Sequence, residues 1–241
     1  MSNLYVVRHV ESLGNLVMGL EREGKEITEL KIKARSYLDV ELPITDYGRQ
    51  QGELTRLRLE QSDSPIDLSS IDLIVCTSSV RTKQTKELLL GDREIPVIFD
   101  DSFYERGFGK FYIWSNEDIF NFSEETYKAW NKDLFGFSDY GVESLAAVRE
   151  RVIPGLEKLL QENPGKNIMI ISHKVPFQII NAYANKVEGA YPKGPEGRKA
   201  YFDFQWDNPV PNMGICRYQI AKKKVIGEPM VSLDSQIMTF Y

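Results

Sequence analysis

The sequence predicts an α/β fold, a three-layer α/β/α sandwich with a mostly parallel central sheet and helical lid insertions. Two short apolar runs, at residues 4–7 and 168–171, have the length and composition of strands that are buried on both faces of a parallel sheet. Each run is followed within two residues by a histidine, His9 in the first case and His173 in the second. A third apolar run at 71–76 also precedes a helical segment, and this alternation of strands and helices favours a parallel sheet.

The composition of the 241 residues is that of an ordinary globular protein. Hydrophobic residues make up 42% and charged residues 27%, which is enough apolar material for a well-buried core. A net charge of −5 argues against nucleic acid or an anionic membrane surface as a partner. Cys76 and Cys216 lie in apolar stretches and are expected to be reduced. The sequence shows no signal segment and no apolar run of membrane-spanning length, so we predict a cytoplasmic protein.

The first strand is expected to bring reactive side chains to the carboxyl edge of the sheet. Arg8 and His9 follow the run 4–7 directly, at the edge where open α/β sheets bind ligands. His173 stands in the same relation to the run 168–171. Since the chain has only two histidines, both at strand ends, imidazole chemistry on an anion is favoured over chance placement in the core or on the surface.

A polar segment at about 16–41 follows the first strand. Its spacing of Glu and Lys residues would support an exposed helix, and we expect it to form an insertion over the sheet. The segment 43–48 then opens a helix that continues to Leu59, with Thr45 or Asp46 as the N-cap.

The second strand, at 71–76, leads into a helix over 81–90, which the Ser and Thr residues between them can cap. Arg81 lies in the first turn of this helix. Phosphate groups favour that position because unpaired backbone N–H groups point outward there. Together with Arg8, Arg81 is predicted to bind an anion rather than to be a solvated helix residue.

A short strand is expected at 95–99, at a sheet edge or a strand start because it contains a proline. It leads into a loop in which Glu105 is followed by Gly107 and Gly109. The segment 111–140 is dense in aromatic residues. We expect it to form one or two short helices packed as a lid, with the rings forming mainly the core of that lid.

The second half of the chain continues the alternation of helices and strands. A long amphipathic helix is expected at 145–160, because its apolar residues follow helical spacing. The strand that ends at His173 is followed by a helix at 175–185, and 187–210 reads as a further insertion rich in glycine, proline and aromatic residues. A closing hairpin is expected at 213–220 and 224–231.

Several short motifs occur in order along the chain. The first is Arg8-His9-x-Glu11-Ser12-x-x-Asn15. The others are Leu42-Pro43-Ile44-Thr45-x-x-Gly48-x-Gln50, Cys76-Thr77-x-x-x-Arg81-Thr82-x-Gln84-Thr85, Glu105 with Gly107 and Gly109, Gly141-Val142-Glu143-Ser144, Ser172-His173, and Pro211-Asn212 to Tyr218. This ordered set resembles the histidine phosphatase superfamily, in the branch containing cofactor-dependent phosphoglycerate mutase and fructose-2,6-bisphosphatase. We therefore expect residues 1–241 to form a single histidine phosphatase-like domain, with insertions at about 16–41, 111–140 and 187–210 that the resemblance does not cover.

The resemblance implies a role for each matching residue. His9 would be the nucleophile that forms a phosphohistidine, and Glu105 would be the general acid for the leaving oxygen and then the base for water. The phosphoryl oxygens would be held by Arg8, Asn15, Arg81 and His173. Such a site is coherent, because phosphoryl transfer depends on positioning and charge neutralisation, and Arg offers planar paired donors. The implied function is hydrolysis of a small phosphomonoester with no metal or other cofactor.

Two residues depart from the family pattern, Val10 and Lys174, each at a position where the family has glycine. Either departure could reshape the pocket, and Val10, which is β-branched and resists a positive φ, favours weak activity. Lys174 is a candidate for contacting an anionic substrate, as is Ser12, and the alternative for Lys174 is a solvated lysine at a helix start. Further cations in the lid segments could bind a second negative charge of the substrate, or could simply be exposed; they are Arg106, Lys110, Lys193, Arg198 and Lys199.

Two other functions remain open at this point. A phosphomutase would use the same residues but would have to retain the phosphohistidine and exclude water. The paired-Arg run ahead of Ser-Phe-Asp that is associated with mutase lids is missing from this sequence. A non-catalytic phosphate-binding or regulatory module would keep the fold, and the two departures from the family pattern favour it slightly. The intact set of matching residues argues against such a module, so phosphatase is the leading interpretation.

Overall fold

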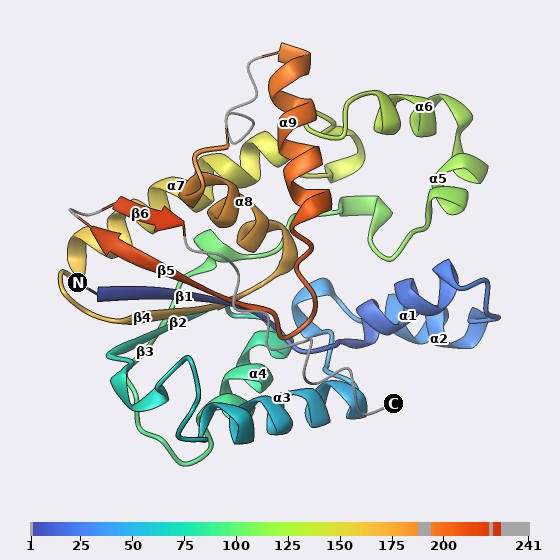
Figure 1. Ribbon diagram of the computed structural model, residues 1–241. Coiled ribbons are helices and arrows are strands. Elements are labelled where there is room, and N and C mark those ends of the chain that lie inside the picture. The colour runs from blue at the N-terminus through green and yellow to red at the C-terminus, as the bar shows by residue number, and fades with distance from the viewer. Residues whose placement is uncertain (1, 188–193, 222–223, 228–241) are drawn as a thin grey trace.

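The computed structural model describes residues 2–187, 194–221 and 224–227 (Figure 1). These residues form a six-stranded sheet with the strand order β3-β2-β4-β1-β5-β6. The strands are β1 (Ser2–Arg8), β2 (Leu73–Cys76), β3 (Val97–Phe99), β4 (Ile168–Ser172), β5 (Ile215–Ala221) and β6 (Lys224–Gly227). The strands β1 to β4 run parallel to their neighbours among themselves, and β5 pairs antiparallel with both β1 and β6. The expected mostly parallel sheet is confirmed, whereas residues 228–231 of the expected hairpin lie outside the described residues.

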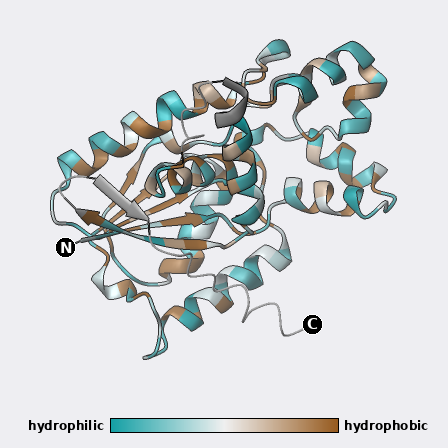
Figure 2. Cartoon of the chain, turned by 45° about the horizontal axis from the view of Figure 1, so that its top comes forward, coloured by the Kyte–Doolittle hydropathy of each residue, from teal (hydrophilic) through white to brown (hydrophobic). Residues whose placement is uncertain are grey.

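Helices cover both faces of the sheet. One face packs on α3 (Asp46–Leu59) and α4 (Val80–Leu90), and the other packs on α7 (Leu145–Glu162) and α8 (Lys174–Ala184). Figure 2 shows the hydrophobic strands between helices whose outer faces are hydrophilic. The three-layer α/β/α sandwich predicted from the sequence is therefore confirmed.

The alternation of side chains along β1 explains why the strand is apolar on both faces. Leu4 and Val6 belong to the core cluster that includes α7 and α8 residues, while Tyr5 and Val7 belong to the cluster on the opposite face. All four are almost completely buried. A continuous apolar run is thus what a strand between two helical layers requires.

The helix α3 shows how a short motif determines local structure. The Thr45 hydroxyl accepts a hydrogen bond of 2.9 Å from the backbone N–H of Gly48, so Thr45 is the N-cap that the sequence offered as one of two choices. A Cβ at Gly48 would lie only 2.2 Å from the carbonyl oxygen of Glu11. Glycine at this position therefore lets α3 pack directly against the loop that follows β1.

The segment after β1 forms two helices, α1 (Leu13–Arg22) and α2 (Thr28–Arg35), and a 3₁₀ turn, η1 (Asp39–Glu41). Instead of one exposed helix over the sheet, the two helices build a small core with residues of the second insertion, among them the buried Ile113. Lys31 joins the two insertions by bridging Glu21 of α1 and Asp118. The two insertions therefore contact each other, on the side of the sheet towards which β1 points (Figure 1).

The second insertion contains α5 (Asn116–Phe122) and α6 (Glu124–Lys132), as expected for a lid of short helices. Its rings pack on one another, with Phe111 in contact with the rings of Trp114, Phe122, Trp130, Phe137 and Tyr140. The prediction that these aromatic residues form mainly the core of the lid is confirmed.

The remaining regular elements are short 3₁₀ turns and one helix. They are η2 (Leu68–Ser70), η3 (Asp101–Phe103), η4 (Gly109–Phe111), η5 (Asp139–Gly141) and α9 (Gly194–Asp207). Within the described ranges, every helix is too short or too polar to cross a lipid bilayer.

Candidate active site

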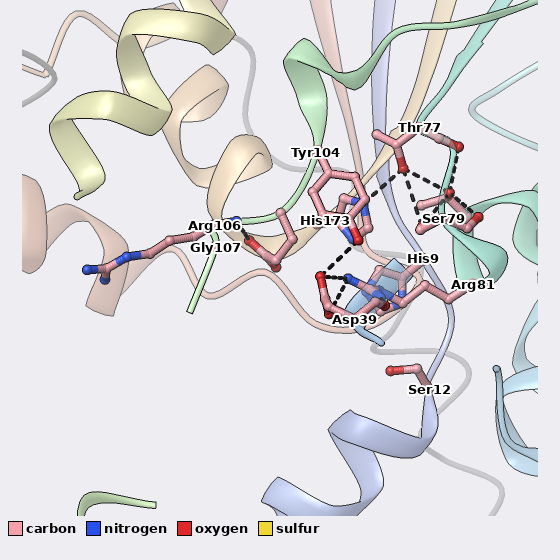
Figure 3. A network of polar contacts seen from close by, with 12 residues as sticks. His9, Ser12, Asp39, Thr77, Ser79, Arg81, Tyr104, Arg106, Gly107 and His173 are labelled. Atoms are coloured by element: carbon pink, nitrogen blue, oxygen red, sulfur yellow. Dashed lines mark hydrogen bonds and ion pairs between the residues drawn. The ribbon is translucent and has the colours of Figure 1, made fainter. Parts of the chain in front are cut away.

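The two histidines meet at the carboxyl edge of the sheet. Because β1 and β4 are adjacent and parallel, with Arg8 opposite Ser172, the residues that follow each strand emerge side by side. The backbone N–H of His9 donates to the carbonyl of Ser172 (3.0 Å), and the imidazole centroids of His9 and His173 are 5.2 Å apart. His9 is 3% exposed and His173 is fully buried. The two rings therefore lie close together at the end of β1 and β4, as Figure 3 shows.

The geometry of His9 fixes which of its nitrogen atoms carries hydrogen. Nδ1 lies 2.6 Å from the carbonyl oxygen of Val10. A carbonyl oxygen only accepts, so Nδ1–H is the donor and Nε2 keeps its lone pair. Burial, and then the charges of Arg81 and Arg8, lower the pKa of His9 well below its usual value. His9 is therefore a neutral imidazole with a free Nε2, which is the form that a nucleophile needs.

Val10 does not strain the loop, contrary to the prediction from its β-branched side chain. Among the described non-glycine residues, only Ile113, Tyr140, Lys186 and Met213 have a positive φ. The Val10 side chain is fully buried in the core cluster under β1, and its N–H donates to the hydroxyl of Thr85 (3.2 Å). Since the backbone at this position has no positive φ, valine fits the loop without backbone strain, and its effect on activity stays a prediction.

Arg81 reaches the same pocket from the first turn of α4 and is 3% exposed. Its guanidinium donates to the backbone carbonyl of Asp39 and lies 3.2 Å from the Asp39 carboxylate. The hydroxyl of Tyr104 donates to the same carboxylate (2.9 Å). Burial opposes the charge of Arg81, but nearby negative groups, Asp39 foremost, raise its pKa. Asp39 thus partly neutralises the cation that was predicted to bind phosphate (Figure 3).

The other predicted phosphate ligands are held by hydrogen bonds within the chain. One terminal nitrogen of Arg8 donates to the carbonyl of Val210 (2.6 Å). Asn15 accepts at Oδ1 from the backbone N–H and the hydroxyl of Ser12, and from Asn212, whose amide also donates to the carbonyl of His9. Ser12 is the N-cap of α1 and is almost fully buried. Ser12 and Asn15 therefore fix the loop after His9 in addition to any contact with a ligand.

His173 has one engaged and one unengaged ring nitrogen. Nε2 lies 2.9 Å from the hydroxyl of Thr77, whereas the buried Nδ1 has no hydrogen-bond partner among the described residues. Burial, followed by the charge of Arg81, lowers the pKa of His173 well below its usual value. A buried ring nitrogen with no partner among the described residues, next to Arg81 and His9, is suited to contact an anion.

Glu105 lies at the amino end of α8, directly beside His173. Its carboxylate accepts hydrogen bonds from the backbone N–H groups of Arg106 (2.9 Å), Lys174 (3.1 Å) and Val175 (3.2 Å). Arg151 of α7 holds the Glu105 loop by donating to the carbonyls of Ser102, Tyr104 and Glu105 and to the carboxylate of Glu143. The predicted acid is thus brought to the two histidines and anchored from a neighbouring helix.

Lys174 is exposed and makes its contact to Glu105 through the backbone, not through the ammonium group. Partial desolvation, and then the charges of Arg8 and Arg22, lower the pKa of Lys174, while Glu105 opposes that change. Lys174 therefore stands in a cationic neighbourhood at the edge of the pocket, where contact with an anionic substrate remains a proposal.

The cationic side chains of the lid segments contact other residues of the protein. Arg106 is buried, donates to the carbonyl of Glu143 and lies over the ring of Trp130, pointing away from the histidines (Figure 3). Lys110 lies 3.9 Å from the ring centroid of Phe122. Arg198 pairs with Asp133, and Lys199 pairs with Asp203. These four residues have contacts within the protein, and the second anion site considered from the sequence stays a prediction; Lys193 lies outside the described residues.

Sequence reasoning missed Asp39, Thr77 as a partner of His173, Tyr104 and Arg151. Asp39 belongs to an insertion that no motif covers, and Tyr104 and Arg151 act through tertiary contacts that have no local signature. Thr77 belongs to the motif around Arg81 and follows a buried strand, but its contact with His173 arises from the pairing of β2 with β4. Among the described residues, no group of three or more His, Cys, Asp or Glu side chains could hold a metal ion.

Comparison with known proteins points to one family. The family model described as histidine phosphatase superfamily (branch 1) matches residues 4–197. The adenosylcobalamin/alpha-ribazole phosphatase of Escherichia coli (strain K12) is 29% identical over 138 residues, which are 56% of this chain and 68% of that protein. Phosphoserine phosphatase 1 of Hydrogenobacter thermophilus is 25% identical over 181 residues, 74% of each chain. The crystal structure of a putative alpha-ribazole-5'-P phosphatase from Escherichia coli K-12 superposes with a TM-score of 0.69 at 21% identity, covering 95% of this chain and 96% of that one, so the fold is shared.

Proposed function

This chain belongs to the histidine phosphatase superfamily (branch 1), and from that premise we propose that it hydrolyses a phosphomonoester through a phosphohistidine on His9, without a metal ion. One observation supports this most strongly. His9 is held neutral with a lone pair on Nε2, beside Arg81 and the Nδ1 of His173, which has no partner in the part of the chain that the structure describes. A nucleophile and donors for phosphoryl oxygens thus share one buried pocket.

In the first step, Nε2 of His9 attacks the phosphorus atom while the bond to the leaving oxygen breaks. Arg8, Arg81 and His173 are proposed to hold the three phosphoryl oxygens, with Asn15 assisting. Charge neutralisation by fixed donors supplies most of the stabilisation that such a transfer needs. The leaving oxygen would take its proton from Glu105, which for this purpose must carry a proton and give up one of its backbone hydrogen bonds.

In the second step, water attacks the phosphohistidine and the bond from phosphorus to Nε2 breaks. Glu105, now a carboxylate, would accept the proton of the attacking water, which restores the starting state together with inorganic phosphate. The proposed substrate is a small phosphorylated molecule, since the similar proteins are named as alpha-ribazole and phosphoserine phosphatases.

Turnover of a nitrophenyl phosphate in the presence of excess chelator tests the proposal. We expect release of nitrophenol and phosphate at the same rate with and without chelator, and inhibition by vanadate. Activity that is lost to chelator and restored by a divalent ion would contradict the metal-free mechanism. Transfer of phosphate between two positions of 3-phosphoglycerate, without net hydrolysis, would show a mutase instead.

The low proton affinity of His9 predicts how the rate depends on pH. As pH falls, the nucleophile stays neutral until its own lowered pKa is reached, so the acid-side limb of kcat/KM should lie below the usual histidine value of about 6.5. A profile from pH 4 to 9 on nitrophenyl phosphate measures this. An acid limb at or above 6.5 would show that His9 is not held neutral by burial and by the neighbouring arginines.

Asp39→Asn is expected to tighten the binding of inorganic phosphate. The substitution keeps the backbone carbonyl that Arg81 contacts but removes a negative charge that competes for the same guanidinium. Removing one charge near a bound dianion should lower the Kd by roughly 3- to 30-fold, measured by calorimetry. The matched control is Glu41→Gln, since Glu41 lies in the same 3₁₀ turn and caps the N–H of Leu38 rather than Arg81. Weaker phosphate binding in Asp39→Asn would mean that the carboxylate orients Arg81 for the substrate.

A further inference from the structure

We propose that three buried hydroxyl groups, of Thr77, Thr82 and Ser79, position the proton of His173 so that the neutral ring donates from Nδ1 to a phosphoryl oxygen. Thr77, which contacts the ring, is the positioning residue, and the other two supply its hydrogen bonds. The inference rests on the proposed function, because it takes an oxyanion to be bound beside His173.

The three hydroxyl groups form a connected cluster behind the ring. Thr77 Oγ1 lies 2.9 Å from Nε2 of His173 and 2.9 Å from Thr82 Oγ1, and Thr82 Oγ1 lies 2.8 Å from Ser79 Oγ. All three residues, and His173 itself, are fully buried. Since no solvent reaches the cluster, the hydroxyl hydrogens must be distributed among these atoms and the nearby backbone carbonyls of Thr77 and Ser79.

Each hydroxyl has one hydrogen to donate, and Thr82 can also donate to the carbonyls of Thr77 and Ser79, so the arrangements fall into two kinds that differ in the direction of the hydrogen bond between Thr77 and His173. In the first, Ser79 donates to Thr82, Thr82 donates to Thr77, and Thr77 donates to Nε2, which leaves the single N–H of a neutral ring on Nδ1. In the second, Nε2–H donates to Thr77, whose hydrogen passes to Thr82, and Nδ1 carries a lone pair. Nδ1 of His173 is therefore a hydrogen-bond donor in the first arrangement and an acceptor in the second.

An anion in the pocket selects the first direction. A phosphoryl oxygen only accepts, so a lone pair on Nδ1 would face it without a hydrogen between them. Adding a second proton to the ring is the alternative, but burial of His173 opposes it first, followed by the charges of Arg81 on α4, Arg8 at the end of β1 and Arg151 on α7. The neutral ring of His9 and the ring of Tyr104 lie 5.2 Å and 5.1 Å away. The neutral ring with Nδ1–H is the state that satisfies the hydroxyl chain and the anion together.

The comparison with His9 shows why hydroxyl groups suit this position. His9 needs a bare Nε2, and the carbonyl of Val10, which only accepts, keeps the hydrogen on Nδ1. His173 needs a hydrogen facing the pocket, so its other nitrogen requires a partner that can donate. A threonine hydroxyl can do so, whereas a carbonyl or a carboxylate in the place of Thr77 would draw the hydrogen to Nε2 and away from the substrate.

Nitrogen NMR of the ¹⁵N-histidine-labelled full chain, saturated with inorganic phosphate, tests the proposal directly. The chain has only two histidines, so the spectrum contains two imidazole rings, and His9→Ala assigns them. We expect His173 to show one protonated and one unprotonated nitrogen, with the hydrogen on Nδ1. A hydrogen on Nε2 alone, or hydrogens on both nitrogens, would overturn the proposal.

Variants of the hydroxyl cluster separate positioning from packing. Thr77→Ser keeps the donor and should keep the His173 pattern. Thr77→Val keeps the shape but leaves Nε2 without a donor, which should remove the single-tautomer pattern and weaken phosphate binding by roughly 5- to 100-fold, the range for an unsatisfied buried group. Thr82 is one hydrogen bond further from the ring, so Thr82→Val should weaken phosphate binding less. This variant replaces Thr77→Val as the test if Thr77→Val does not fold. Unchanged phosphate Kd and an unchanged pattern in both valine variants would also overturn the proposal.

These measurements distinguish failure of the inference from failure of the proposed function. If phosphate binds with His173 as expected but no substrate is hydrolysed, the proposed function is wrong and the hydroxyl chain still describes an anion site. If turnover through phosphohistidine is found but the bound form holds an imidazolium at His173, the proposed function stands and the inference is wrong.

Discussion

His9→Ala is expected to lower kcat by about 10⁴- to 10⁶-fold, as found when a nucleophile that acts within a catalytic unit is removed. Alanine cannot accept the phosphoryl group. His173 is the one other histidine of the chain, and its proposed role is to hold a phosphoryl oxygen. The measurement is the steady-state rate on nitrophenyl phosphate, with the variant purified separately from any wild-type enzyme to avoid carry-over.

The control for His9→Ala must show that the variant is folded and that its anion-binding residues keep their positions. His9 is almost fully buried, so the substitution leaves a cavity. Binding of inorganic phosphate by calorimetry should persist, since Arg8, Arg81 and His173 remain. A variant that is folded, binds phosphate and retains more than about a hundredth of the wild-type kcat would rule out His9 as the nucleophile, because removing a nucleophile costs far more.

Glu105→Gln is expected to lower the rate on alkyl phosphates by about 10²- to 10⁴-fold, the range for a lost general acid. An alkoxide leaving group needs a proton as the bond to phosphorus breaks, and the glutamine side chain has no acidic proton to give. A nitrophenolate leaves without a proton, so the first chemical step on nitrophenyl phosphate should be affected much less. Single-turnover rates on the two substrates measure the difference.

Asp101→Asn is the matched control, because Asp101 is the other acidic candidate of this loop region. Its carboxylate accepts from the backbone N–H and the hydroxyl of Ser78, outside the contact between Glu105 and α8. Its substitution should leave the ratio of the two rates unchanged. Equal losses on both substrates in Glu105→Gln would assign Glu105 to positioning, and a changed ratio in Asp101→Asn would move the acid role to Asp101.

Much of the fold could be predicted because its determinants are local. The runs 4–7 and 168–171 are apolar throughout, which is typical of strands between two helical layers. Thr45 and Gly48 mark the start of α3 through a cap and a close backbone contact. The segment 16–41 was harder, because its helices are stabilised by tertiary contacts. Its small core includes Ile113, a residue from a distant part of the sequence.

The residues of the candidate site also fall into those that local sequence predicts and those that depend on tertiary contacts. Residues that directly follow strands, such as His9 and His173, could be placed because parallel strands end at a common edge. Asp39 could not, since its approach to Arg81 depends on how an insertion folds back over α4. The concern about Val10 was wrong because it assumed a backbone conformation that the loop does not adopt.

Trapping of the covalent intermediate shows whether the phosphoryl group is transferred to His9. The enzyme is mixed with a ³²P-labelled phosphomonoester, quenched in base within milliseconds and digested, and the labelled peptide is sequenced by mass spectrometry. We expect an acid-labile, base-stable phosphoryl group on His9, bonded to Nε2, that is absent from His9→Ala. A label on another residue, or a label that persists in His9→Ala, would rule out phosphoryl transfer to His9.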